Sequence, residues 1–280
     1  MATIGLFDSG MGGLSVLRAV RAQWPQAELV YLGDNGHVPY GSRPLAQVRA
    51  FSEAITRFLL ARQAQVVVVA CNAASAAALK SLRQTFPTVP FVGMEPAVKP
   101  AAEQTHTKVV GVLATPATFQ GELFASVVER FAQGVTVLRE VCPGLVQQIE
   151  AGEIDTPKTE ALLRGWVEPM LARNIDVLVL GCTHYPFVIP LLEKICGPGV
   201  RVIDPAPAFA RQVGRVLAAS GLASASGLAG AMPPSERRRL TYYTSGDCAN
   251  FKRVLLRLEI EPGEVRAVQW LGGDLQEAGA

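Results

Sequence analysis

The feature that most constrains the fold of this 280-residue chain is an internal repeat. Four segments of the first half match four of the second in the same order, at offsets of 105 to 111 residues. The pairs are IGLFDSG with VGVLATP, ELVYLGD with VTVLREV, VVVVACNAAS with VLVLGCTHYP, and VGMEPA with VIDPAP. One such match is ordinary for parallel strands, whereas four at a shared offset predict two similar α/β halves.

Each half alternates short apolar runs with longer segments of helical period, which is typical of β-α units on a mainly parallel, buried sheet. Helices are predicted over Pro44–Gln63, Ala73–Gln84, Thr159–Arg173 and Ala206–Ala219. The predicted strands are Thr3–Phe7, Glu28–Leu32, Val66–Ala70, Phe91–Gly93, Val109–Leu113, Val135–Leu138, Val177–Leu180, Val200–Ile203 and Leu240–Thr244.

The C-terminal segments RLTYYTSGD, CANFKRVLLRL and VRAVQWL predict a strand, a helix and a strand that have no counterpart after the first half. We expect them to complete the N-terminal domain. Residues 1–96 plus 207–280 would then form one α/β domain, and residues 97–206 the second. Ser220–Ser235 is rich in Ser, Ala, Gly and Pro, which predicts a loop.

Composition and charge exclude several classes of protein. With 49% hydrophobic and 18% charged residues, the chain has the composition of a globular protein rather than a disordered one. A net charge of +2 does not favour a nucleic-acid partner. The apolar runs are too short for a membrane span, the N-terminus lacks a signal peptide, and five irregularly spaced cysteines fit a reducing compartment. We therefore expect a cytoplasmic protein without a membrane partner.

The repeat places Cys71 and Cys182 at the same point, directly after the third strand of each half. Ligands of open α/β sheets bind outside the carboxyl ends of the strands, so both thiols are predicted on binding edges. Either cysteine alone is as well explained by packing, but repetition in register favours a function. Two opposed thiols can remove a proton from one face of a carbon and return one to the other, which inverts that carbon without redox chemistry.

The loop D-S-G-M-G-G, which begins at Asp8, follows the first strand. Its glycines let backbone amides approach an anion such as a carboxylate. A dinucleotide loop is the competing interpretation, but the spacing is not G-x-G-x-x-G and Asp8 would repel phosphate. Asp8 can cap the next helix, bind a substrate ammonium or orient a thiol.

His184, two residues after Cys182, can stabilise a thiolate or move its proton. A metal site formed by Cys71, Cys182 and His184 is an alternative, although the chain has neither C-x-x-C pairs nor H-E-x-x-H. A redox pair or regulatory disulfide between the two cysteines is another. These alternatives stay open from the residues alone.

In order along the chain, GLFDSGMGGLSVL, VPYGSRP, ACNAASAAAL, GLVQQIEAGEID, LGCTHYPF and VIDPAPA resemble the signature segments of the glutamate racemase family, within the aspartate/glutamate racemase superfamily. The resemblance covers essentially the whole chain. It implies two pseudo-symmetric three-layer α/β domains with mainly parallel sheets and an active site in the cleft between them. It also implies a homodimer that interconverts L- and D-glutamate without a cofactor or metal and supplies D-glutamate for peptidoglycan.

The resemblance also assigns residues. Cys71 and Cys182 match the acid/base cysteines, the first serving D-glutamate and the second L-glutamate. Asp8 and His184 match the polar partners of the thiols and positions at the substrate, and Glu150 is a further catalytic candidate. The remaining substrate-binding positions are matched by Ser9, Tyr40, Gly41, Asn72, Ala73 and Thr183.

Two segments depart from the family pattern. The common C-N-T-A segment is C-N-A-A here, so Ala73 replaces the usual threonine, and the lost hydroxyl costs about 0.5 to 1.5 kcal/mol of binding if nothing replaces it. The segment G-D-N-G-H before Val38 differs from the commoner G-D-T-A. An aspartate racemase or a broader amino-acid racemase is therefore the alternative.

Overall fold

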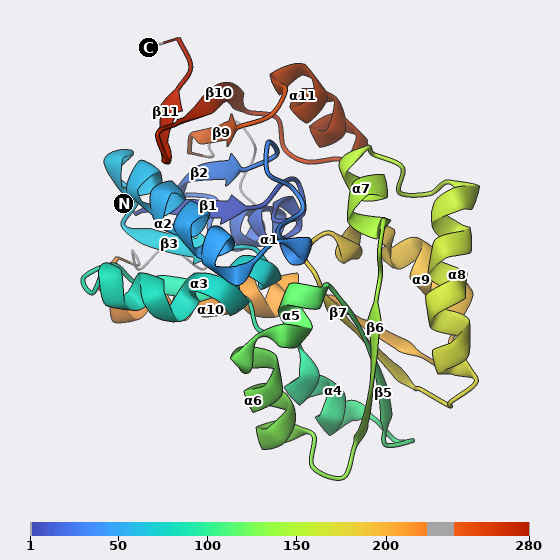
Figure 1. Cartoon of the computed structure of the whole chain (residues 1–280). Helices are drawn as coiled ribbons and strands as arrows, with labels where there is room; N and C mark the ends of the chain where they lie inside the picture. Colours follow the sequence, from blue (N-terminus) through green and yellow to red (C-terminus); the bar gives the residue numbers. More distant parts are fainter. Residues whose placement is uncertain (1, 223–237, 280) are drawn as a thin grey trace.

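The computed structural model describes residues 2–222 and 238–279, and their strands form two separate sheets (Figure 1). The first sheet has seven strands in the order β11-β10-β9-β2-β1-β3-β4, and the second has four in the order β6-β5-β7-β8. The strands are β1 Thr3–Asp8, β2 Glu28–Gly33, β3 Val66–Val69, β4 Phe91–Gly93, β5 Val109–Ala114, β6 Thr136–Val141, β7 Val177–Gly181, β8 Arg201–Ile203, β9 Leu240–Thr244, β10 Glu264–Leu271 and β11 Asp274–Glu277.

The sequence repeat is a repeat of topology. β2-β1-β3-β4 in the first sheet and β6-β5-β7-β8 in the second have the same order, and every pairing within the two sets is parallel. The nine predicted strands are all present. The prediction of two similar α/β halves is therefore confirmed.

The C-terminal strands extend the first sheet, as the red ribbon beside the blue strands shows in Figure 1. β9 pairs with β2 and β10 with β9, both parallel, and β11 adds to β10 in the antiparallel sense. We call the part built on the seven-stranded sheet the first lobe and the part built on the four-stranded sheet the second lobe. The domain bounds 1–96 plus 207–280 and 97–206 stay a prediction, which this pairing supports.

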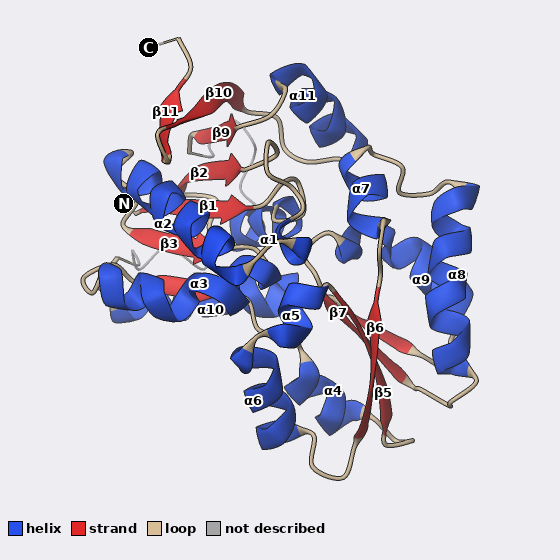
Figure 2. Cartoon of the chain, viewed as in Figure 1, coloured by secondary structure: helices blue, strands red, loops and turns tan. Residues whose placement is uncertain are grey.

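Helices cover both faces of each sheet (Figure 2). In the first lobe α1 packs with α10 and α2 with α3, while in the second α8 packs with α9 and α4 with α6. The helices are α1 Leu14–Gln23, α2 Leu45–Ala61, α3 Asn72–Thr85, α4 Val98–Gln104, α5 Pro116–Gln120, α6 Glu122–Phe131, α7 Leu145–Glu150, α8 Pro157–Leu171, α9 Ile189–Cys196, α10 Ala206–Ala219 and α11 Cys248–Arg257, with 3-10 turns η1 Tyr40–Ser42 and η2 Tyr185–Val188.

The central strand β7 shows why the sheets are covered on two sides. All five of its residues are buried, and they alternate between two hydrophobic clusters. Leu178 and Leu180 join the cluster that contains residues of α8 and α9, whereas Val177 and Val179 join the one that contains residues of α4 and α6. Continuous apolar runs of this kind form strands with both faces buried.

One predicted strand has different bounds in the structure, and most of one predicted loop lies outside the described residues. β6 ends at Val141 rather than Leu138, because it is an edge strand that tolerates the polar side chains of Arg139 and Glu140. Residues 223–235 of the predicted loop lie outside the described residues. Within residues 2–222 and 238–279, none of the helices combines the length and apolarity that a membrane span requires.

Candidate active site

The two thiols line one small cavity where the lobes meet. Nine of the predicted site residues line it, together with Pro39, Thr115 and Val146: Ser9, Tyr40, Gly41, Cys71, Asn72, Ala73, Cys182, Thr183 and His184. Cys71 lies two residues after the end of β3, and Cys182 follows β7 directly. The parallel strands of each lobe thus deliver a thiol from their carboxyl ends, where open α/β sheets bind ligands.

Cys71 is held at the start of helix α3. It is the N-cap of that helix, and its Sγ accepts a hydrogen bond from the Ala74 amide at 3.4 Å. Sγ also lies 4.0 Å from Ser9 Oγ, and this hydroxyl donates to Asp8 Oδ1 at 2.8 Å. Burial and the charge of Asp8 raise the pKa of the Cys71 thiol well above its usual value, and the Ala74 amide offsets this only in part.

Cys182 has a different partner. Its Sγ lies 3.7 Å from His184 Nδ1, and His184 Nε2 lies 2.6 Å from Glu150 Oε1. Burial lowers the pKa of His184, but the hydrogen bonds with Cys182 and Glu150 outweigh it and raise that pKa well above its usual value. The arrangement favours an imidazolium that donates to the thiolate on one side and to the carboxylate on the other.

The carboxylate on the side of each thiol accepts hydrogen bonds from the opposite lobe. Asp8, in the first lobe, accepts a hydrogen bond at Oδ2 from the Thr183 hydroxyl of the second lobe at 2.7 Å. Glu150, in the second lobe, accepts the Met11 amide of the first lobe at 2.6 Å and the Asn35 side-chain amide at 2.9 Å. Both acid/base centres are therefore complete only when the lobes are together.

The cleft is closed in this structure. The cavity between the thiols has a volume of about 10 Å³, roughly the room of one water molecule. Glycines permit the close approach, since a Cβ at Gly10 would meet the Glu150 carboxylate and one at Gly41 would lie 2.5 Å from the Thr115 Cβ. An amino acid can enter only after the lobes separate.

Two predicted binding residues differ in what they offer the cavity. The Tyr40 hydroxyl donates to Asp34 Oδ2 at 2.6 Å and is therefore engaged within the first lobe. The Asn72 side chain is buried, and neither of its polar atoms has a hydrogen-bond partner among the described residues. Buried polar groups are nearly always satisfied, so the Asn72 amide is suited to a polar ligand.

Sequence reasoning missed three polar groups at this site: the hydroxyl of Thr115, the side chain of Asn35 and the backbone amide of Met11. Thr115 could have been found, because the offset of 106 that aligns Ile4 with Val110 also aligns Ser9 with Thr115. Asn35 and the Met11 amide reach the site only across the junction of the lobes. No spacing along the chain signals that contact.

The alternatives based on a metal or a disulfide gain no support. Among residues 2–222 and 238–279, no three His, Cys, Asp or Glu side chains are grouped so that they could hold a metal ion. The five cysteines are free thiols. Cys71, Cys182 and His184 thus do not make the metal cluster considered from the sequence.

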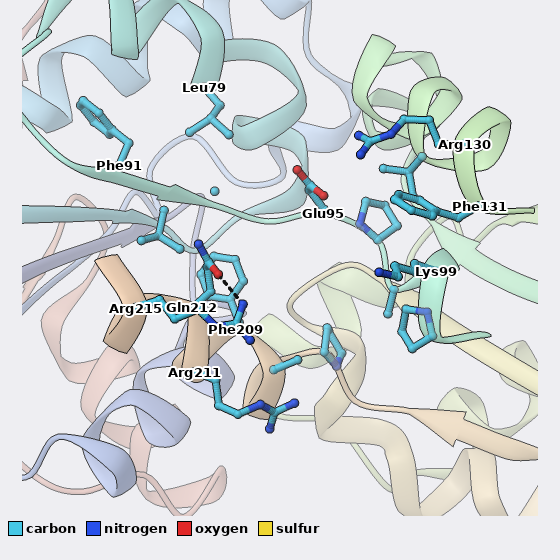
Figure 3. A pocket seen from close by; sticks show the side chains of 18 of the residues that line it. Leu79, Phe91, Glu95, Lys99, Arg130, Phe131, Phe209, Arg211, Gln212 and Arg215 are labelled. Carbon is cyan, nitrogen blue, oxygen red and sulfur yellow. Dashed lines mark hydrogen bonds between the residues drawn. The ribbon is translucent and has the colours of Figure 1, made fainter. Parts of the chain in front are cut away.

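A second cavity, of about 510 Å³, has neither Cys71 nor Cys182 among its lining residues; Figure 3 shows this cavity. Its walls carry Lys99, Arg130 and Arg211 beside the apolar rings of Phe131 and Phe209, and they include no cysteine or histidine. The larger space therefore lacks the acid/base groups that the small cavity brings together. The small cavity between the lobes is therefore the candidate active site.

Comparison with known proteins gives a consistent result. The sequence model of the family described as Asp/Glu/Hydantoin racemase matches residues 14–213. A glutamate racemase of Roseiflexus sp. (strain RS-1) is 50% identical over 258 residues, which cover 92% of each chain.

Two solved structures resemble the whole fold. The glutamate racemase of Thermus thermophilus in complex with β-chloro-D-alanine is 36% identical with a TM-score of 0.78, covering 96% of this chain and 97% of that one. The glutamate racemase of Escherichia coli, in complex with L-glutamate and the activator UDP-MurNAc-Ala, is 29% identical with a TM-score of 0.82, covering 97% and 99%.

Proposed function

The chain belongs to the glutamate racemases of the Asp/Glu/Hydantoin racemase family, and from this premise we propose that Cys71 and Cys182 interconvert L- and D-glutamate by a two-base mechanism. As a member of that family, it is an isomerase that acts on an amino acid. The observation that carries the mechanism is that two thiols from equivalent strand ends line one cavity. Inversion of Cα requires a proton acceptor on one face and a donor on the other.

The protonation states of the two thiols follow from their surroundings. In this proposal Cys182 acts first as the base, because the raised pKa of His184 beside it favours an imidazolium that can donate to a negative sulfur. Cys71 is the thiol, because burial and Asp8 raise its pKa. These roles suit L-glutamate once it has entered the opened cleft: Cys182, as thiolate, takes the α-proton while the Cys71 thiol delivers its own proton to the opposite face, forming D-glutamate.

The reverse reaction starts from the state that remains, in which Cys71 is the thiolate and Cys182 the thiol. Cys71 then removes the α-proton of D-glutamate and Cys182 supplies the proton to the other face. This direction matches the family assignment of Cys71 to D-glutamate and Cys182 to L-glutamate. One proton is lost and one gained by Cα in each direction, so the reaction needs no oxidant or reductant, and the proposal includes no cofactor.

We place the substrate by the groups that face the cavity. Ser9, Thr183 and Thr115 line it, and their hydroxyls can donate to the carboxylates of glutamate once Ser9 and Thr183 turn away from Asp8. The buried, unpartnered amide of Asn72 and the nearby charge of Asp8 suit the α-ammonium. Fixed dipoles in a cleft that excludes water stabilise the negative charge that develops on Cα.

The wider role is part of the same proposal. D-glutamate made in this way would supply peptidoglycan synthesis, and a reducing cytoplasm would keep Cys71 and Cys182 as free thiols. The homodimer and the domain bounds 1–96 plus 207–280 and 97–206 are carried over from the sequence as expectations. Size-exclusion chromatography with light scattering measures the oligomeric state.

The substrate assignment is tested by circular dichroism of the purified protein with each enantiomer of glutamate and of aspartate. We expect the signal of L- or D-glutamate to decay to zero, and aspartate to turn over much more slowly. Aspartate rates equal to or above those of glutamate would replace glutamate by the alternative substrate, because Ala73 is one departure that bears on binding.

A further inference from the structure

The second oxygen of the Glu150 carboxylate is held by Asn35. Asn35 Nδ2 donates to Glu150 Oε2 at 2.9 Å, while Oε1 faces His184 and accepts the Met11 amide. Asn35 lies two residues after β2 in the first lobe, and Glu150 is the last residue of α7 in the second lobe. The hydrogen bond therefore crosses the cleft.

The orientation of the Asn35 side chain is itself fixed by a hydrogen bond to its carbonyl oxygen. The Thr244 hydroxyl at the end of β9 donates to Asn35 Oδ1 at 2.9 Å and accepts the Gly246 amide at 3.1 Å. Because the Asn35 carbonyl oxygen is thus engaged, its NH₂ group is the one that faces Glu150. The C-terminal strands, which the repeat does not explain, thereby reach the active site.

The charged and titratable groups around Glu150 show what an amide adds. His184 contacts Glu150 directly, Tyr31 of β2 interacts with its charge, and Arg253 of α11 shares a neighbouring cavity with it. Asn35 donates a hydrogen bond without bringing a charge that would compete with His184. A hydrogen bond to a carboxylate favours its ionised form and fixes the direction of its lone pairs.

We propose that Asn35 is a positioning residue for the Cys182 side of the reaction, acting through Glu150 and His184, an inference that rests on the two-thiol mechanism above. It holds the Glu150 carboxylate aimed at the His184 ring, which lies beside Cys182. Since the bond crosses the cleft, closure of the lobes completes this support. Asn35 belongs to the G-D-N-G-H segment, one of the two departures from the family pattern.

The test measures the pH dependence of iodoacetamide alkylation at Cys182 and Cys71, read as separate peptides by mass spectrometry. The proteins are the wild type, Asn35→Ala, Thr244→Val and the control Ser245→Ala. Ser245 bonds to Asp34 and to the Gly36 amide in the same loop, but no hydrogen bond joins it to Asn35 or Glu150. Loosening of the loop alone would therefore appear in the control.

In Asn35→Ala we expect the alkylation midpoint of Cys182 to rise by about one pH unit and that of Cys71 to stay in place, because a charge-assisted hydrogen bond is lost only on the Cys182 side. Thr244→Val should shift Cys182 in the same direction by less. Racemisation by Asn35→Ala should lose about tenfold in kcat/KM. The loss must be equal in both directions because the enantiomers have equal free energy.

An unchanged Cys182 midpoint in Asn35→Ala would overturn the proposal, as would an equal shift in Ser245→Ala. The alkylation readout requires no turnover. A wild-type protein that fails to racemise glutamate would therefore reject the two-thiol mechanism while the role of Asn35 in the ionisation of Cys182 is still measured.

Discussion

The two lobes share an architecture but surround their thiols differently. Their core strands have the same order, and the offset of 111 residues that aligns Cys71 with Cys182 also aligns Asn72 with Thr183 and Ala73 with His184. At the end of the first strand of each half, Asp8 in the first lobe corresponds to Ala114 in the second. The duplicated fold thus fixes where the sulfur atoms lie, and the residues beside them set how readily each gives up its proton.

The difference has a chemical consequence. A carboxylate beside a buried thiol opposes its ionisation, whereas an imidazolium favours it. In the proposed mechanism Asp8 therefore favours Cys71 as the acid, and His184 favours Cys182 as the base. Two identical environments would give the thiols equal intrinsic pKa values and would not favour one as the acid and the other as the base.

The largest effect is expected when the thiol of one lobe is removed and the other is kept. Cys71→Ala or Cys182→Ala should each lower racemisation by at least about 10³-fold, because one face of Cα then lacks its acid/base group. Circular dichroism of glutamate measures the loss. Cys248→Ala, on helix α11, is the control that should retain activity, and wild-type turnover in either site variant would reject the two-base assignment.

The second prediction concerns the loss of the charged neighbour of each thiol. His184→Asn should raise the pH at which Cys182 is half alkylated, and Asp8→Asn should lower it for Cys71, since each change removes the charge that shifts that thiol. Both variants should lose about 10²-fold in activity at neutral pH.

The pH dependence of kcat/KM of the wild-type enzyme should also report on the charge of His184. The raised pKa of His184 means that its positive charge persists through neutral pH and is lost on the alkaline side. As the pH rises through that pKa, the Cys182 thiolate loses its cationic partner and kcat/KM should fall. An alkaline limb that His184→Asn leaves in place would assign that limb to another group.

The third prediction separates closure from folding. In Gly41→Ala the new Cβ would lie 2.5 Å from the Thr115 Cβ of the second lobe, so closure is opposed while an open cleft accommodates the methyl group. We expect KM for glutamate to rise about tenfold with little change in Tm. Gly165→Ala, on the exposed face of α8 with no atom within 4 Å of the new Cβ, should leave the kinetics unchanged.

The smallest expected effect concerns Ala73, the counterpart of His184. Ala73→Ser restores a hydroxyl at the cavity wall, and we expect glutamate binding to strengthen by about 0.5 to 1.5 kcal/mol. The KM for glutamate measures this. An unchanged KM would show that other hydroxyls, such as that of Thr115, already serve the same carboxylate.

Much of the fold follows from local pattern, and the exceptions have physical reasons. Buried parallel strands such as β3 and β7 are continuous apolar runs, so their positions could be predicted within a residue. β11 has the polar sequence DLQE and is a strand because it pairs with β10, which no local pattern signals.

The candidate site likewise contains residues that the sequence alone locates and contacts that it does not signal. Cys71 and Cys182 follow predicted strands and repeat in register, so the sequence alone locates them. The bond from Asn35 to Glu150 depends on how two lobes close over a separation of 115 residues along the chain. Such contacts are set by tertiary packing, and only the structure reveals them.

In the proposed mechanism two separate bases act on opposite faces of Cα. Racemisation of L-glutamate in heavy water, followed at early times, tests this directly. The account predicts solvent deuterium at Cα of the D-glutamate formed, while the remaining L-glutamate keeps its protium. Equal deuterium in both enantiomers would mean that a single base serves both faces, and the two-thiol account would then be wrong.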